Sequence, residues 1–375
     1  MWRSGGCAAR RSAGSAARRS AAARRPSASS RPLGTAPPPA PPAAPRDLAL
    51  PDTLRAAVAA AGPALRQRGF AVVDGAFGET WCHLLRDDII TLTELQALDH
   101  NATHLVRADG STELLAKHAI FETEPMEHAA LEAACPWLLR LGRDGRLSAG
   151  LSDALSSGPL GRQTMKVQLN AGGGACFPYH FDSDRAVDSR VVTAILYLNP
   201  GWAQQDGGQL QLLPCPLAPV EVDPLFDRLV LFSSTDMLHR VLPSQTTRLC
   251  LTLWFYANGD DEDASGDDSP PASGQDDAPA MQALRLLLRP DFRHLFARYV
   301  YAREWALSIE QSHEPSQGRS HAVSTHWDDV AAIRLAALSR LEAAGLTEKA
   351  FDGACDLIPL TADESYVQYF HDVCD

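Results

Sequence analysis

The 375-residue sequence lacks the features that define several large classes of protein. No apolar run approaches the roughly 20 residues that a transmembrane helix needs, so we expect no membrane span. The eight cysteines form no CxxC pair and keep no regular spacing. This pattern indicates reduced, mostly buried thiols rather than a disulfide framework or a structural zinc site. No Gly-Lys-Ser/Thr follows the glycine run at 172–174, which we interpret as a flexible turn and not as a phosphate loop.

Acidic residues are absent from the first 46 positions. These positions hold nine arginines, so the formal net charge of −12 is the sum of +9 from this head and −21 from residues 47–375. A body that acidic repels phosphate backbones, and we expect no nucleic-acid partner. The head is rich in Arg, Ser and Ala and lacks an apolar h-region, which is typical of a mitochondrial or plastid transit peptide. A disordered tail on a cytoplasmic protein is the alternative.

Composition also indicates where domains begin and end. Residues 1–46 are expected to be the head followed by a Pro- and Ala-rich linker. Residues 47–259 are expected to form the main domain, with its core at 164–258. Residues 260–279 are strongly acidic and nearly devoid of apolar side chains, which indicates a disordered linker. Residues 280–375 are expected to be a helical extension without chemistry of its own. The sequence carries no signal for an oligomeric state.

Hydrophobic periodicity predicts helices before and after a β-rich centre. The helices are expected at 53–68, 79–98, near 126–141 and at 327–344. From Thr164 the pattern changes to short apolar runs separated by turn residues. These runs predict strands at Met165–Asn170, Arg190–Leu198, Gly208–Leu213, Arg228–Phe232, Leu238–Leu242 and Arg248–Tyr256. So many short strands with no helix between them predict a mainly β fold with flanking helices, a sandwich or jelly roll.

Three side chains in the β-rich centre have the types and spacing of a metal site. His180 and Asp182 are two residues apart, so on an extended strand they project to the same face. His239 lies 59 residues further on (239 − 180), where a jelly roll could bring its strand beside the first. Two imidazoles and one carboxylate are the facial ligand set of non-haem Fe(II) oxygenases. A simple surface pair is the alternative for His180 and Asp182. Zinc could occupy the same ligands, but no HExxH motif is present.

Arg248 is expected to bind an anion. It lies in an apolar strand, where a guanidinium is costly to bury unless a carboxylate pairs with it. The distal carboxylate of 2-oxoglutarate would make that pair. Tyr197 could donate its hydroxyl to the same carboxylate. An internal ion pair for Arg248 and simple packing for Tyr197 are the alternatives.

Residues 164–258 resemble the catalytic domain of the prolyl 4-hydroxylase branch of Fe(II)/2-oxoglutarate oxygenases, and in particular the oxygen-sensing prolyl hydroxylases. The matching motifs are His180-Phe-Asp182, Tyr197-Leu-Asn199, Gly207-Gly-Gln-Leu210, Phe226-Asp-Arg228-Leu229, His239-Arg240-Val241 and Arg248 with Trp254-Phe255. The resemblance implies a double-stranded β-helix that binds Fe(II), uses 2-oxoglutarate and O₂ as cosubstrates, and takes ascorbate as its reductant. It implies 4-hydroxylation of a proline in a protein or peptide. Asp182 favours hydroxylation because related halogenating enzymes replace this carboxylate with a small residue.

Two departures from the family weaken the inference about the substrate. The family usually has a tyrosine three residues before its first histidine, where this chain has Phe177. A further tyrosine, nine or ten residues before that histidine, is replaced by Ala171 or Asn170. Gln168 and Asn170 are candidates for the missing hydrogen bonds, so Gln168, Asn170 and Phe177 form the expected substrate pocket. Hydroxylation of another side chain or a small molecule stays open, and so does a catalytically inactive jelly roll that acts as a binding module.

Overall fold

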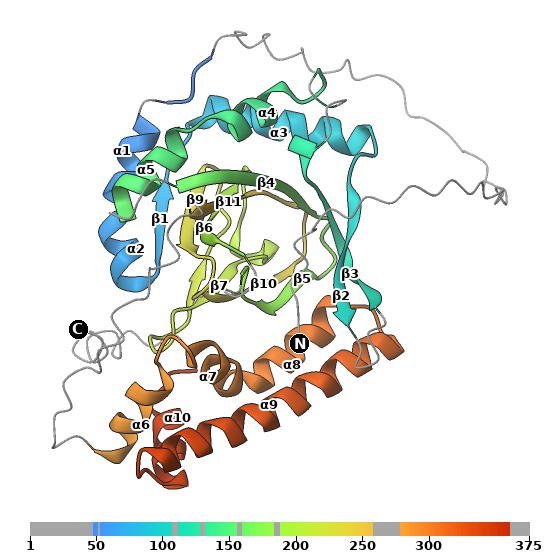
Figure 1. Ribbon diagram of the computed structural model, residues 1–375. Coiled ribbons are helices and arrows are strands. Elements are labelled where there is room, and N and C mark those ends of the chain that lie inside the picture. The colour runs from blue at the N-terminus through green and yellow to red at the C-terminus, as the bar shows by residue number, and fades with distance from the viewer. Residues whose placement is uncertain are drawn as a thin grey trace. The chain divides into compact units, whose positions relative to one another are not determined.

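Two antiparallel β-sheets form the centre of the structure, a computed structural model (Figure 1). It describes residues 48–51, 53–106, 112–127, 131, 133–155, 160–183, 188–257 and 278–360. The arginine-rich head at 1–46 and the acidic linker up to residue 277 therefore lie outside the described residues. The described residues from Leu50 onward belong to one compact unit. None of the described helices is both long and apolar enough to cross a membrane.

The larger sheet has seven strands in the order β1-β9-β6-β11-β4-β3-β2. Its strands are β1 (Phe70–Asp74), β2 (Asp99–Val106), β3 (Thr112–Thr123), β4 (Leu160–Asn170), β6 (Arg190–Tyr197), β9 (Arg228–Ser233) and β11 (Arg248–Ala257). The smaller sheet has four strands in the order β5-β10-β7-β8. Its strands are β5 (Ala175–His180), β7 (Leu210–Leu213), β8 (Val220–Val222) and β10 (Leu238–Ser244).

Helices cover the sheets on two sides (Figure 1). Those before the β-rich centre are α1 (Thr53–Ala60), α2 (Gly62–Arg68), α3 (Glu79–Glu94), α4 (Pro136–Arg143) and α5 (Arg146–Leu155). Those after it are α6 (Pro279–Leu287), α7 (Arg293–Val300), α8 (Ala302–Ser312), α9 (Gln317–Ala343) and α10 (Glu348–Asp356). Two 3₁₀ turns lie at Pro125–Glu127 and Gln204–Asp206.

Two apolar clusters hold these layers together. The first combines residues of both sheets, such as Val230 and Phe232 of the larger sheet with Leu212 and Val241 of the smaller one. The second joins the smaller sheet to the helices that follow it. Burying apolar area on both faces of the smaller sheet stabilises the strands that carry the histidines.

The predicted fold class is confirmed: the chain is mainly β with flanking helices and adopts a double-stranded β-helix. All six strands predicted from Thr164 onward are present; β4 begins five residues before its expected start (165 − 160), and the other ends shift by at most two residues. The strands β5 and β8 were not among them, and both are short. A strand also expected at Phe70–Asp74 is β1.

Several helix predictions were wrong at their ends. The helix expected over 53–68 is two helices that meet at Ala61, and the one expected to reach 98 ends at Glu94. The helix expected from about 126 begins only at Pro136. The last long helix begins at Gln317 rather than near 327, because the side chain of Ser316 caps it by accepting the Arg319 N–H.

The β2–β3 hairpin was missed altogether, since its polar residues resemble a loop. Its strands pair from Asp99 opposite Glu122 to Val106 opposite Thr112, and Ile120–Thr123 pair with β4 in the larger sheet. Ala119 has a φ of 51°, so the strand bends there. Beyond this bend the hairpin reaches the region between α8 and α9, where Lys117 forms an isolated backbone bridge with His313. Figure 1 shows the hairpin descending from the larger sheet to these helices.

Candidate metal centre

Neighbouring strands of the smaller sheet bring the two histidines together. His180 is the last residue of β5 and is paired in register with His239 on β10. Their ring centroids lie 4.2 Å apart. Asp182 follows β5, and its Oδ1 lies 3.6 Å from Nε2 of His180 and 3.8 Å from Nε2 of His239. Among the described residues, these three form the one group of His, Cys, Asp and Glu side chains arranged to hold a metal ion.

Hydrogen bonds decide which atoms of the two histidines face one another. Nδ1 of His180 lies 2.8 Å from the Pro178 carbonyl oxygen, and Nδ1 of His239 lies 3.0 Å from that of Met237. A carbonyl oxygen only accepts, so we assign the proton of each ring to Nδ1. Each Nε2 then keeps its lone pair for a metal, as metal-binding histidines require.

Asp182 is oriented in the same way by its neighbours. Its Oδ2 accepts hydrogen bonds from Oγ1 of Thr193 at 2.6 Å and Nε1 of Trp254 at 3.2 Å. The Arg190 guanidinium donates to its backbone carbonyl at 3.1 Å. Oδ1 is therefore left facing the imidazoles. Thr193 and Trp254 were not predicted as site residues, although Trp254 lies six residues after Arg248 on one strand and so projects to the same face.

The ionisation states of these side chains suit a cation. Burial, and then the neighbouring His239, lower the pKa of His180 to about 3. Burial acts to raise the pKa of Asp182, but His239, His180 and the bonds from Thr193 and Trp254 outweigh it and the pKa is lowered. At neutral pH the site thus offers a neutral imidazole and a carboxylate, the forms that bind metals.

Arg248, the first residue of β11, is buried with little to neutralise it. Its Nε donates to the Gly208 carbonyl at 2.8 Å, and its guanidinium carbon lies 4.9 Å from the ring centroid of Tyr197. Within the described ranges, no carboxylate lies within 4.0 Å of this guanidinium. Gly208 has a φ of 77°, and a Cβ there would lie 2.9 Å from Cδ of Arg248. The glycine turn therefore permits the close approach of the arginine.

Two further buried polar groups lie on the same face as Arg248. Asn170 is its register partner on β4 and is fully buried. Neither polar atom of the Asn170 amide, nor the hydroxyl of the fully buried Tyr197, has a hydrogen-bond partner among the described residues. Burial raises the pKa of Tyr197, so the hydroxyl keeps its proton to donate. Unpaired buried polar atoms are costly, and a bound polar ligand would satisfy them.

Gln168 and Phe177, the other two residues of the predicted substrate pocket, differ from Asn170 in that neither has a buried polar atom without a hydrogen-bond partner. Oε1 of Gln168 lies 3.4 Å from the Cys250 thiol and 3.3 Å from the Thr252 hydroxyl, both of which donate to it. Gln168 is therefore already paired. The Phe177 ring lies 6.3 Å from that of His180 and adjoins the metal centre without a hydroxyl.

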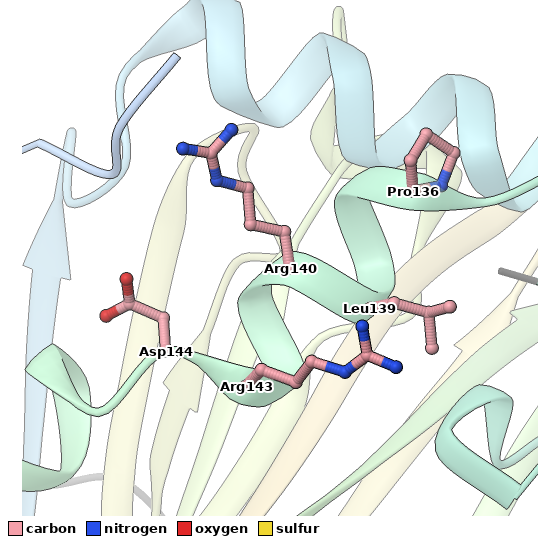
Figure 2. Close-up of a pocket in the computed structure, with 5 residues that line it drawn as sticks. All are labelled: Pro136, Leu139, Arg140, Arg143 and Asp144. Carbon is pink, nitrogen blue, oxygen red and sulfur yellow. The ribbon is translucent and has the colours of Figure 1, made fainter. Parts of the chain in front are cut away.

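A pocket of about 380 Å³ lies elsewhere on the surface, lined by Pro136, Leu139, Arg140, Arg143 and Asp144 (Figure 2). Figure 2 shows the Arg140 and Arg143 side chains pointing in different directions from α4, so they do not converge on one ligand. None of its residues belongs to the metal centre.

A double-stranded β-helix with two imidazoles on paired strands and a carboxylate just beyond one of those strands defines the class of non-haem iron oxygenases. Residues 165–256 match the sequence profile of the 2OG-Fe(II) oxygenase superfamily. The chain therefore contains a 2OG-Fe(II) oxygenase domain, whose family uses Fe(II) and 2-oxoglutarate.

Comparison with individual proteins gives prolyl hydroxylases. Prolyl hydroxylase EGLN3 of Mus musculus is 37% identical over 98 residues, which are 25% of this chain and 41% of the relative. Egl nine homolog 1 of Mus musculus is 26% identical over 205 residues, 52% of this chain and 48% of the relative. The chain thus spans less than half the length of these relatives. A solved prolyl 4-hydroxylase structure from Phytophthora capsici has 29% sequence identity and a TM-score of 0.64, and covers 82% of this chain and 94% of that one.

Proposed function

We propose that this protein is a prolyl hydroxylase that oxidises a proline in a protein or peptide while it converts 2-oxoglutarate to succinate and CO₂. His180, Asp182 and His239 would hold Fe(II) through the two Nε2 atoms and Oδ1. Bound Fe(II) would supply the oxidative chemistry with O₂ and 2-oxoglutarate. Ascorbate as a reductant belongs to this proposal on the family resemblance alone.

The observation that carries the proposal is a buried guanidinium that has no carboxylate partner among the described residues and lies on one face with two unpaired polar groups. Arg248 and Tyr197 would bind the distal carboxylate of 2-oxoglutarate, the guanidinium by a charge-assisted pair and the hydroxyl by one further hydrogen bond. The Asn170 amide, without a partner in the described part of the chain, would orient the same molecule. A metal site alone would not need these groups. Together with three free ligand atoms they suit a chelating dicarboxylate.

Two findings support proline as the substrate. The relative EGLN3 is a prolyl hydroxylase by name, and the solved structure that covers 82% of this chain is a prolyl 4-hydroxylase. The replacement of two family tyrosines, one by Phe177 and the other by Ala171 or Asn170, favours a second candidate, the hydroxylation of another side chain or a small molecule. An inactive binding module would not need to keep all three ligand atoms and a buried guanidinium.

A peptide and metabolite screen tests the proposal. The Fe(II)-loaded protein is incubated with 2-oxoglutarate and each candidate, and products are examined by mass spectrometry for a gain of one oxygen. A proline-containing peptide should gain the oxygen with one succinate formed per event, and omission of 2-oxoglutarate should abolish both. A gain confined to a metabolite or another side chain would establish the second candidate. Absence of any succinate would leave the inactive module.

A further inference from the structure

A buried lysine lies on the segment of β3 that crosses from the larger sheet toward the smaller one. Ile120–Thr123 pair with β4 in the larger sheet, whereas Lys117 forms its backbone bridge with His313, directly after α8. Helix α8 packs on β5, the strand of His180. Oγ1 of Thr103, from the neighbouring strand, lies 3.1 Å from Nε2 of His313 and fixes the hairpin there. The larger sheet on one side and the end of α8 on the other therefore hold Lys117 near the strand of His180.

The Lys117 side chain is turned toward the site rather than toward water. It is only 9% exposed, and its ammonium lies 5.1 Å from the centroid of the Phe177 ring. That ring in turn adjoins His180, with 6.3 Å between the ring centroids. The sequence has only three lysines, Lys117, Lys166 and Lys349. Most cations of this chain are arginines, whereas this position has a lysine.

The ammonium of Lys117 has more donors than partners. It donates to the Asn101 side-chain oxygen, and an ammonium has three protons. In the portion of the chain that the structure describes, no carboxylate lies within 4.0 Å of it. The nearby carboxylate of Glu122 bonds to other groups instead. It accepts hydrogen bonds from the Asn101 amide and from Lys166, the latter at 3.0 Å. Lys117 is a buried cation with unused hydrogen-bonding capacity.

Lys166, on the neighbouring strand β4, allows the charge environments of two lysines to be compared. Lys166 lies 3.0 Å from Glu122 and 3.7 Å from Glu124, so its charge is compensated. Lys117 differs in having no such pair, and burial lowers its pKa from 10.5 to about 8. Because the pKa of Lys117 is lower in the folded state, folding disfavours the protonated ammonium. At neutral pH, below both pKa values, the ammonium is protonated in both states, so the free-energy penalty is fully present. The hydrogen bond to Asn101 and the nearby charge of Glu122 offset this cost only in part.

We propose that Lys117 is a specificity-determining residue that binds a carboxylate of the substrate, an acidic side chain near the residue that is hydroxylated. The inference rests on the proposed function and adds the class of substrate to it. A buried cation without a direct carboxylate partner favours an anion over a neutral oxygen. The body of the chain, with its net charge of −21 (−12 minus +9 from the head), would otherwise disfavour an acidic peptide. Arg248 and Tyr197 already provide for 2-oxoglutarate, so the substrate is the remaining source of a carboxylate.

A matched peptide library tests this inference. Each peptide has one proline, and each of the three positions on either side is in turn Asp, Asn or Lys. At one position the parent protein should prefer Asp over Asn by about tenfold to a hundredfold in kcat/KM, mainly through KM, as expected for one hydrogen bond to a charged group. Lys117→Met should abolish this preference, and Lys117→Arg should retain part of it because it keeps the charge.

Two further measurements on the same variants separate a binding role from a structural one. Lys117→Met should melt no lower than the parent, because removal of the buried charge offsets the hydrogen bond that the Asn101 side-chain oxygen loses, and Lys349→Met, an exposed position, is the control. A clear fall in the melting temperature would make Lys117 structural and overturn the inference. A fall in 2-oxoglutarate affinity as large as that of Arg248→Gln would assign Lys117 to the cosubstrate and also overturn it. Equal rates for Asp and Asn peptides would overturn this inference alone, whereas no hydroxylation of any peptide would overturn the proposed function with it.

Discussion

In each side chain of the candidate metal centre, a hydrogen bond engages one polar atom and leaves the other available to a metal. The Pro178 and Met237 carbonyls hold the protons of the two imidazoles, and Thr193 with Trp254 holds one oxygen of Asp182. Side chains oriented in this way lose little conformational freedom when a cation arrives. Such supporting contacts raise metal affinity without touching the metal.

We expect His239→Ala to abolish metal binding and turnover while the fold persists. Two remaining ligands are too few to hold a labile Fe(II), and the fold depends on the two apolar clusters rather than on this side chain. Metal content after dialysis, succinate formation and circular dichroism would be compared with the parent. Full succinate formation by this variant at ordinary iron concentrations would contradict the ligand assignment.

Loss of the Arg248 guanidinium should raise the 2-oxoglutarate requirement roughly tenfold to a hundredfold. A hydrogen bond to a charged group contributes about 1.5–3 kcal/mol, and about 1.4 kcal/mol corresponds to one decade. Arg248→Lys should recover part of the affinity, since it keeps the charge and loses the planar fork. Tyr197→Phe should give a smaller rise. The measurement is a 2-oxoglutarate titration of each variant, with metal affinity as the control. An unchanged requirement in Arg248→Gln would place the cosubstrate clamp elsewhere.

Sequence spacing was enough to find the residues that the two sheets bring together. His180, Asp182 and His239 share a type and spacing that few other functions require, and a buried arginine in an apolar strand is conspicuous. Lys117 was not found, because its position depends on the bend at Ala119 and on a backbone bridge to a residue nearly 200 positions away (313 − 117 = 196). A contact of that kind leaves no local pattern.

At the scale of elements, helix ends and the β2–β3 hairpin were the hardest to predict. The hairpin carries polar side chains on the face that adjoins the site, so the usual alternation of apolar and polar residues is lost. The last long helix begins where Ser316 satisfies a free backbone N–H, ten residues before the expected start (327 − 317). Tertiary contacts decide such boundaries more than propensity does.

Helices α3 and α4 are joined by a carboxylate that should make stability depend on pH. Asp88 on α3 accepts the N–H groups of Trp137 and Leu138, at 2.7 and 2.9 Å, at the start of α4. Burial nevertheless raises its pKa from 3.8 to about 6. The folded state therefore binds a proton that the unfolded state releases between these values, and the contribution of Asp88 to stability falls as pH rises from about 4 to about 6.

Asp88→Asn keeps an acceptor and removes the charge, so the variant should lose this pH dependence. Its unfolding free energy relative to the parent should rise by up to about 3 kcal/mol between pH 4 and pH 7, at 1.36 kcal/mol per pKa unit. Denaturant titrations of both proteins across this range give the difference directly. A difference that does not change with pH would show that the Asp88 carboxyl titrates normally.

The strand β5 depends on a helix for one of its backbone hydrogen bonds. The pairing of β5 with β10 shifts in register between His239 and Val241, and the Tyr179 N–H donates instead to Oγ of Ser308 on α8 at 3.0 Å. Tyr179 is adjacent to His180. A residue of the C-terminal helices thus helps to position a metal ligand.

Ser308→Ala should lower both the stability and the metal affinity of the protein. It leaves the buried Tyr179 N–H without an acceptor, which costs about 1–3 kcal/mol. Ser312→Ala is a matched control on the same helix, because the Ser312 hydroxyl bonds only within the chain around it, to Ile309 and His313. Melting temperature and metal affinity would be measured for both variants. Equal metal affinities in the two variants would contradict a positioning role for Ser308.

At the scale of the whole molecule, we propose that the protein is directed to an organelle by residues 1–46, with cytoplasmic residence as the alternative. Support comes from the composition of that stretch, nine arginines and no acid. A fusion of residues 1–46 to a fluorescent reporter should enter mitochondria or plastids. A version with the nine arginines replaced by glutamine is the control and should remain outside. A cytosolic signal from the unmodified fusion would contradict the targeting proposal without affecting the enzymatic one.

The hydrogen bond between Tyr179 and Ser308 joins residues 129 positions apart in the chain, and it has a thermodynamic consequence. Two events that share a contact are linked, and the linkage is reciprocal. If docking of α8 favours metal binding, then a bound metal favours docking of α8 by the same free energy. A cell short of iron would thus hold a population of this protein whose C-terminal helices open more often.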